Sequence, residues 1–173
     1  MGAWDNFEGM GNSLENYYNN GTEIAEDFNS VWKCNSHAFV ASLTTYEENR
    51  KDKHEGPRES EIFSFSDCSI NEGVTYADLL KADAKYSAFL KKLEKEDPVF
   101  RLFPTAGMPQ DASFDFKMMD ISSSWSQRGS ETQTFVNNGG PLKQLETYGS
   151  IVSCDSPRVY QMERVRLGKP WVK

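Results

Sequence analysis

Gly11-Asn-Ser-Leu-Glu-Asn-Tyr-Tyr-Asn-Asn-Gly21 is the stretch from which the architecture can be inferred, because the chain contains a second version of it. The second version is Gly129-Ser-Glu-Thr-Gln-Thr-Phe-Val-Asn-Asn-Gly139. Both begin with Gly and end in Asn-Asn-Gly, and both carry an aromatic residue, Tyr17 or Phe135, two positions before that Asn-Asn pair. The likeness continues downstream, where Cys34-Asn-Ser corresponds to Cys154-Asp-Ser. We infer a degenerate internal repeat, which indicates a duplicated architecture and no particular chemistry.

The first copy predicts two short helices followed by a strand. Apolar residues recur at helical spacing over residues 13–31, and the run is interrupted where Gly21 fits a left-handed helix cap. Residues 37–46 combine apolar residues with Ser and Thr, which is typical of a strand. Trp4 and Phe7 precede the helices in a short polar context and suggest the end of a further strand.

The remainder of the chain predicts strand, helix, strand, strand, helix and strand over residues 62–167. Residues 62–70 and 114–121 alternate side chains as strands do. The clearest helix begins after Thr75, which forms a capping-box pattern with an acidic residue, and ends at Asp97-Pro98. This βαββαβ order is that of a ferredoxin-like unit.

We therefore expect an α+β fold in which a ferredoxin-like unit is joined by a duplicated half-unit. Its antiparallel sheet should be covered by helices on one face. The half-unit, with the first repeat copy, occupies residues 1–46, and the ferredoxin-like unit, with the second copy, occupies residues 62–173. Residues 47–61 are nearly all charged and contain Gly-Pro, which is typical of an exposed connector.

Composition excludes several classes of function. The chain has 173 residues and a net charge of −7, which argues against binding to nucleic acid or to an anionic membrane surface, because both need a basic face. No apolar run approaches the roughly 20 residues that span a bilayer. The N-terminus lacks the pattern of a signal peptide, so a cytoplasmic location is expected.

Cysteine and histidine are too few and too dispersed for a metal site. The three cysteines, Cys34, Cys68 and Cys154, are widely spaced, and the two histidines are His37 and His54. No Cys-x-x-Cys pair is present, so we expect neither a metal nor a bound cofactor. The cysteines are expected to be reduced and buried, as free cysteines usually are.

Two residues are candidates for catalysis. His37 opens a strand and could act as a general base or a haem ligand, or simply bond to the backbone. Asp120 interrupts an apolar strand face, where burial would raise its pKa for acid–base work, unless it caps a turn. Four further residues are expected to line a binding pocket or to belong to the core and its rim: Phe116, Trp125, Tyr160 and Arg164. Whether the protein is an enzyme is left open.

Element order and duplication resemble the dimeric α/β barrel superfamily, which includes NIPSNAP-like and antibiotic-biosynthesis-monooxygenase-like proteins. Cys68-Ser-Ile-Asn-Glu-Gly73 before a helix and Trp125 after a strand fit this resemblance. It implies sheets that close against each other. The half-unit could be completed within the chain, by extension of the sheet of residues 62–167, or by a second copy. We expect a homodimer, with strands near 37–46 or 114–121 close to the interface. The favoured function is binding of a small apolar molecule between sheet and helices. The alternatives are a non-catalytic structural or interaction module, and a cofactor-independent or haem-linked monooxygenase that uses His37.

Overall fold

The computed structural model describes residues 4–31, 38–47 and 60–163. The chain forms two compact units, Met1–His37 and Ala38–Lys173. The expected half-unit 1–46 is therefore divided, because the strand at its end belongs to the second unit. Most of the charged connector 47–61 lies outside the described ranges. Four residues named above also lie outside them: Cys34, His37, His54 and Arg164.

The first unit is helical in its described part. Helix α1 spans Phe7–Asn20 and α2 spans Thr22–Val31. The side chain of Asn6 accepts a hydrogen bond from the backbone N of Gly9 at 2.8 Å, so it caps the N-terminus of α1. The strand end suggested around Phe7 is wrong, because this cap begins a helix there.

The two Asn-Asn-Gly corners each separate a pair of helices, but their glycines differ in conformation. Gly21 has φ −102°, so the left-handed cap predicted there is wrong. Its backbone N donates to Tyr17 O at 2.7 Å, and a Cβ at Gly21 would lie 2.5 Å from that oxygen. Gly139 does adopt the left-handed conformation, with φ 72°. The common origin of the two copies stays a prediction.

The second unit is built on an antiparallel sheet. Its strands are β1 (Phe39–Tyr46), β2 (Ser60–Ile70), β3 (Val99–Ala106), β4 (Phe116–Ser122), β5 (Val152–Cys154) and β6 (Arg158–Glu163). The strand order is β1-β3-β4-β2-β5, and β6 also pairs with β2, so the sheet does not close on itself. β5 and β6 together form one interrupted strand along β2. The expected α+β class and antiparallel sheet are confirmed.

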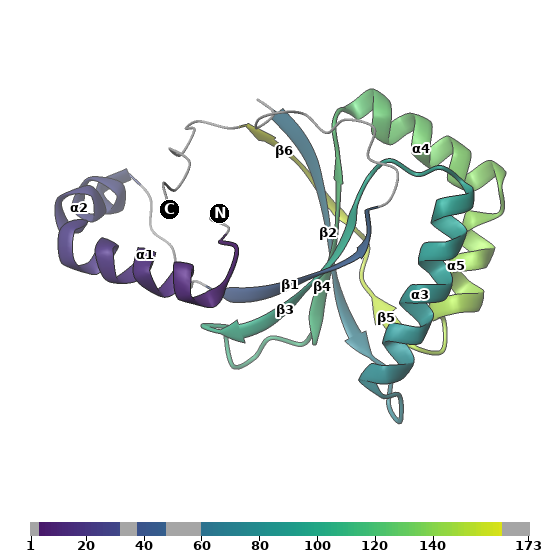
Figure 1. Cartoon of the computed structure of the whole chain (residues 1–173), viewed down its shortest axis with the longest axis horizontal. Coiled ribbons are helices and arrows are strands. Elements are labelled where there is room, and N and C mark those ends of the chain that lie inside the picture. The colour runs from purple at the N-terminus through teal and green to yellow at the C-terminus, as the bar shows by residue number, and fades with distance from the viewer. Residues whose placement is uncertain (1–3, 32–37, 48–59, 164–173) are drawn as a thin grey trace. The chain divides into compact units, whose positions relative to one another are not determined.

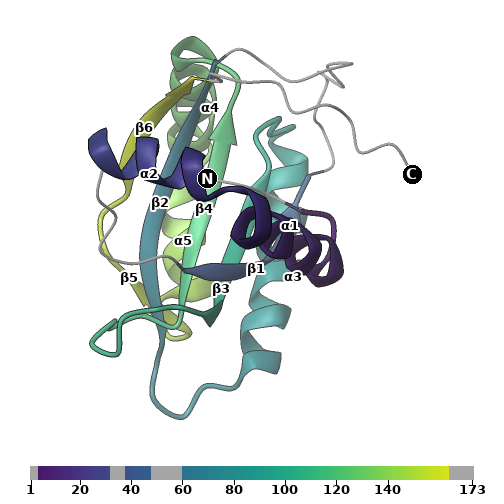
Figure 2. The ribbon, with the colours of Figure 1, turned by 90° about the vertical axis from the view of Figure 1, so that its left-hand side faces the viewer.

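Three helices of this unit lie on one face of the sheet, as Figures 1 and 2 show. They are α3 (Tyr76–Lys92), α4 (Trp125–Asn137) and α5 (Gly140–Tyr148). The capping box at the start of α3 is confirmed, because Thr75 and Asp78 exchange hydrogen bonds. α3 joins β2 to β3, while α4 and α5 join β4 to β5, so each connection crosses over a neighbouring strand.

The two faces of the sheet differ in composition, and the register of β2 with β4 confirms the predicted alternation. Ser64 and Ser66 lie opposite Asp120 and Met118 on the face toward the helices. The face away from these helices, here called the outer face, carries an apolar cluster beside the ion pairs that Asp67 forms with Lys117 and Arg158. It carries Phe63, Phe65, Phe100, Leu102, Met119, Ile121 and Tyr160.

The core of the second unit lies beneath α3. Cys68, Leu79 and Phe116 are fully buried there and contact each other. The α3 sequence predicts that Leu79, Leu80, Phe89 and Leu90 pack on the sheet. Leu79 and Leu90 are buried and Phe89 is half-buried, but Leu80 is 42% exposed and the prediction is wrong for that residue. Successive helical residues point about 100° apart, so Leu80 leaves the stripe that Leu79 begins.

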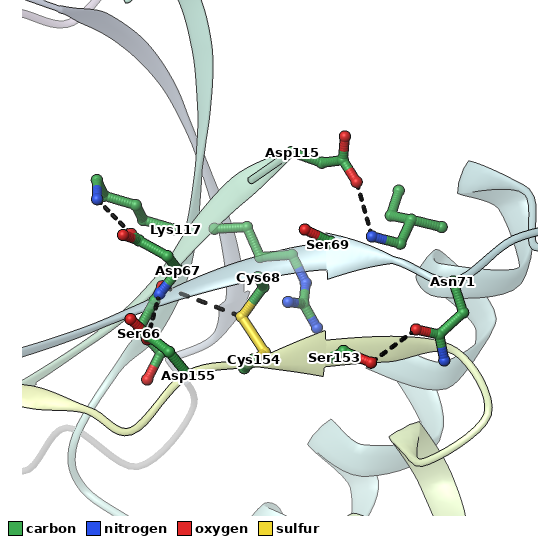
Figure 3. The surroundings of a disulfide bond; sticks show 12 residues. Ser66, Asp67, Cys68, Ser69, Asn71, Asp115, Lys117, Ser153, Cys154 and Asp155 are labelled. Carbon is green, nitrogen blue, oxygen red and sulfur yellow. Dashed lines mark hydrogen bonds and ion pairs between the residues drawn. A yellow bond between two sulfur atoms is a disulfide. The ribbon is translucent and has the colours of Figure 1, made fainter. Parts of the chain in front are cut away.

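Cys68 and Cys154 form a disulfide bond, so the expectation of reduced thiols is wrong for both (Figure 3). The antiparallel register of β2 with β5 places the two residues directly opposite each other. Two side-chain hydrogen bonds hold the same strand junction, from Asp67 N to Asp155 Oδ1 at 2.8 Å and from Ser153 Oγ to Asn71 Oδ1 at 2.8 Å. The pairing of two strands that are distant in sequence therefore determines which cysteines are bonded. The internal repeat gave no indication of this bond, because it related Cys154 to Cys34.

Reduction of this bond is expected to lower the free energy of unfolding by about 2–4 kcal/mol, because the bond closes a long loop in the unfolded chain. The two cysteines are 86 residues apart. Urea unfolding with and without a thiol reductant measures the effect. A Cys34→Ser variant should respond to the reductant as the wild type does, whereas Cys154→Ser should not respond. An unchanged midpoint for the reduced wild type would contradict the prediction.

Candidate ligand-binding cavity

A cavity of about 690 Å³ lies between the sheet and helices α3, α4 and α5. The strand register arranges its floor in two rows across the sheet. One row runs from Arg101 through Met118 to Ser66, and the next runs from Asp120 to Ser64. Serine is the smallest polar side chain with a hydroxyl, so the two serines leave space beneath the helices.

A buried ion pair connects the floor of the cavity to its walls. Arg101 Nε donates to Asp83 Oδ2 at 2.8 Å, and Arg101 Nη2 donates to Asp83 Oδ1. Tyr148 Oη, from α5, also donates to Asp83 Oδ1 at 2.8 Å. Burial alone would lower the pKa of Arg101, but the hydrogen bonds and charge of Asp83 outweigh it and raise that pKa. The guanidinium therefore stays charged inside the fold.

A second polar cluster closes the end of the cavity where α3 leads into β3. Glu131, from α4, accepts hydrogen bonds from the backbone N of Glu96 at 2.7 Å and of Asp97 at 2.9 Å, and from Lys95 Nζ. Burial would raise the pKa of Glu131, but Lys95 and these hydrogen bonds outweigh it and lower that pKa. Asp97 accepts a hydrogen bond from Ser122 Oγ, yet burial raises its pKa to about 6, helped by the charge of Glu131.

Asp97 makes the stability of the protein depend on pH in mildly acidic solution. Its pKa is raised from 3.8 to about 6 on folding, so the folded state binds the proton more tightly than the unfolded chain. The free energy of unfolding should consequently fall as pH rises through that window. Asp97→Asn should remove this fall, as measured by urea unfolding at several pH values. A variant that keeps the wild-type slope would contradict the assignment.

Asp120 is the catalytic candidate that the structure places in the cavity. It lies on the helix-facing side of β4 and accepts a hydrogen bond from Arg128 Nη1, on α4, at 2.7 Å. Its side chain is 28% exposed. The alternative in which Asp120 caps a turn does not apply, because the carboxylate is held by a helix across the cavity.

The other described candidates do not line the cavity with Asp120. Phe116 is fully buried in the core, where Arg101 Cζ lies 4.6 Å from the centre of its ring. Trp125 is 54% exposed and donates through Nε1 to Gln161 Oε1 at 3.0 Å. Tyr160 belongs to the outer face, where its ring lies near that of Phe65. The expectation that these side chains form one pocket is wrong, because they lie on different faces of the sheet or within its core.

The cavity is also more polar than expected. Apolar residues such as Tyr86, Leu90 and Phe135 contribute to its walls, but ionisable and hydroxyl groups form much of its lining. Six of these groups were not predicted from the sequence: Ser64, Ser66, Asp83, Asp97, Arg101 and Glu131. Asp83 did carry a signal, because it falls on the stripe of α3 that also contains Leu79 and Leu90.

Comparison with protein-family models, with curated proteins and with solved structures gives no match for this chain. The candidate site therefore depends on its geometry alone. Over residues 4–31, 38–47 and 60–163, no cluster of three or more His, Cys, Asp or Glu side chains is arranged to hold a metal ion. Within the same ranges, no helix has the length and apolar character needed to cross a membrane.

Proposed function

We propose that the protein binds a small molecule in the cavity between the sheet and helices α3, α4 and α5. The observation that carries the proposal is a space of about 690 Å³ lined by buried ionisable groups. Ligand pockets commonly have volumes of about 300–1,000 Å³ and a few convergent polar groups. The ligand expected from the sequence was apolar, whereas this lining favours a molecule that has both an apolar part and polar groups.

The energetics of the lining support a role in binding. A buried ion pair such as Asp83–Arg101 seldom stabilises a fold more than apolar residues of the same volume would. Asp97 retains a carboxyl group whose burial disfavours its charged form. Groups that add little to stability, and that converge on one space, are typical of binding and catalytic sites. Binding is proposed here without a catalytic step.

Filling the cavity tests the proposal. Ser66 is 3% exposed and lies on the cavity floor, so Ser66→Leu should occupy the space and abolish binding of fragments from a small-molecule library. Binding is measured by the shifts of cavity amide resonances in ¹H–¹⁵N spectra of the full chain. Circular dichroism checks that the variant remains folded.

Ser42→Leu provides the matched control, because Ser42 is exposed and lies opposite Leu102 on the outer face. It makes the same chemical change away from the cavity and should leave fragment binding intact. The proposal fails if no fragment shifts the cavity resonances of the wild type. It fails equally if the same fragments still bind Ser66→Leu.

We also propose that β2 to β6 form a ferredoxin-like unit related to the dimeric α/β barrel superfamily. The strand order β3-β4-β2-β5 and the two crossing connections support this relationship. The homodimer belongs to the same proposal and rests on the resemblance to that superfamily, since Leu102 and Met119 of the outer face are only 8% exposed within the chain itself. Light scattering decides the dimer: a monomer mass near 19.7 kDa would exclude it.

A cytoplasmic location stays a prediction, and the disulfide bond argues against it. Cys68 and Cys154 are bonded, and disulfides persist mainly in oxidising compartments.

A further inference from the structure

Arg101 has one donor group that nothing in the described part of the chain occupies. Its Nε and Nη2 atoms donate to Asp83. Nη1 is buried and has no hydrogen-bond partner, in a residue that is only 2% exposed. A buried N–H group without an acceptor destabilises the folded state, and native proteins retain few of them. An acceptor from outside the chain would resolve this.

The place of Arg101 in the cavity lining makes a ligand the natural source of that acceptor. The ring centres of Phe116 and Tyr148 lie 4.6 Å and 5.4 Å from Arg101 Cζ, so both rings help to hold the guanidinium in place. Asp83 uses the edge of the guanidinium between Nε and Nη2, which leaves the edge between Nη1 and Nη2. That edge can present two parallel N–H donors to a planar oxygen acceptor, which is either a carbonyl or a carboxylate.

The charges of the cavity lining favour a neutral carbonyl over a carboxylate as the ligand's acceptor group. Each cation of the lining is paired with a carboxylate of the lining: Arg101 with Asp83, Arg128 with Asp120, and Lys95 with Glu131. A ligand carboxylate would enter a site without surplus positive charge, so the loss of its hydration would be poorly compensated. A neutral carbonyl accepts the same hydrogen bonds and brings no charge out of water.

We propose that the cavity binds a neutral molecule through a carbonyl group that accepts hydrogen bonds from Arg101. This inference rests on the proposed function and specifies its ligand class. Benzamide and benzoate form a matched pair of probes, because they share a ring and a planar acceptor and differ in charge. The ring suits the aromatic walls supplied by Tyr86 and Phe135.

In ¹H–¹⁵N titrations of the full chain, benzamide should shift the resonances of Arg101, Ser66 and Tyr148. Benzoate should bind about tenfold more weakly. Benzoate that binds as tightly as benzamide, or a cavity that binds neither probe, would overturn the inference.

Two variants test the contact itself. Arg101→Lys keeps a cation beside Asp83 but lacks the forked donor edge, so benzamide should bind about tenfold more weakly. Asp83→Asn retains an acceptor oxygen but leaves Arg101 without its counter-charge, so the preference should reverse and benzoate should bind more tightly than benzamide. If Arg101→Lys does not fold, Asp83→Asn alone tests the inference. The inference is overturned if Asp83→Asn still binds benzamide more tightly than benzoate.

The outcome is separable from that of the proposed function. The carbonyl inference alone would be overturned if fragments bind the wild-type cavity, do not bind Ser66→Leu, and bind Arg101→Lys as tightly as the wild type. Fragments that Ser66→Leu does not exclude would overturn the proposed function.

Discussion

Arg101→Met is expected to lower the free energy of unfolding by about 3–5 kcal/mol, because it leaves the Asp83 carboxylate buried without its counter-charge. Asp83 is 6% exposed, and its remaining side-chain hydrogen bond comes from Tyr148. Met keeps the apolar stem of the side chain but not the guanidinium, so the loss also includes the contacts of Arg101 with the rings of Phe116 and Tyr148. Urea unfolding, monitored by circular dichroism, measures the change.

The double variant Arg101→Met with Asp83→Leu provides the control. Replacement of a buried ion pair by apolar residues of similar volume is often neutral or stabilising. The double variant should therefore recover most of the stability that the single variant loses, and this non-additivity isolates the cost of the unpaired charge. A double variant as unstable as Arg101→Met would mean that the pair is needed for packing. A single variant as stable as the wild type would mean that Asp83 is not buried as described.

Local sequence patterns predicted the elements of the second unit because each carries its own periodic signal. Ser64 and Ser66 alternate with Phe63 and Phe65 along β2, and that period of two assigned each residue to the correct face. Thr75 began α3 through a capping interaction that involves only neighbouring residues. The start of α1 was missed although Phe7 and Met10 continue the helical spacing of Leu14, because Gly9 and Gly11 interrupt that stretch.

The partner of β1 and the disulfide were not specified by local sequence patterns, because they depend on contacts between distant residues. β1 pairs with β3, so it extends the sheet of the second unit instead of completing a separate half-unit. Cys68 meets Cys154 only because β5 pairs with β2. Local periodicity does not specify which strands become neighbours.

A cavity between the sheet and its helices was expected and its lining was not, while its role in binding stays a prediction. Asp120 was identified there as a carboxylate on an apolar strand face. The same reasoning applied to Asp83 on α3 and Arg101 on β3 would have identified each of them as a buried charge. What no local pattern reveals is that these two charges face each other, since one lies on a helix and the other on a strand.

Leu79→Ala is expected to lower the free energy of unfolding by about 2–5 kcal/mol, through loss of buried methyl groups and the cavity left behind. Leu79 is fully buried and contacts Cys68 and Phe116 in the core beneath α3. The disulfide at Cys68 restrains this part of the core, so relaxation around the deleted side chain should be limited and the cost should lie toward the upper end of the range.

Leu80→Ala is the matched control, because it makes the same chemical change one position along the same helix. Leu80 is 42% exposed, and Ala has the higher helix propensity, so the loss should stay below about 1 kcal/mol. Urea unfolding of both variants under oxidising conditions gives the comparison. Equal losses at the two positions would mean that α3 is rotated about its axis from the orientation described. The core under α3 would then have to be assigned to a different face of the helix.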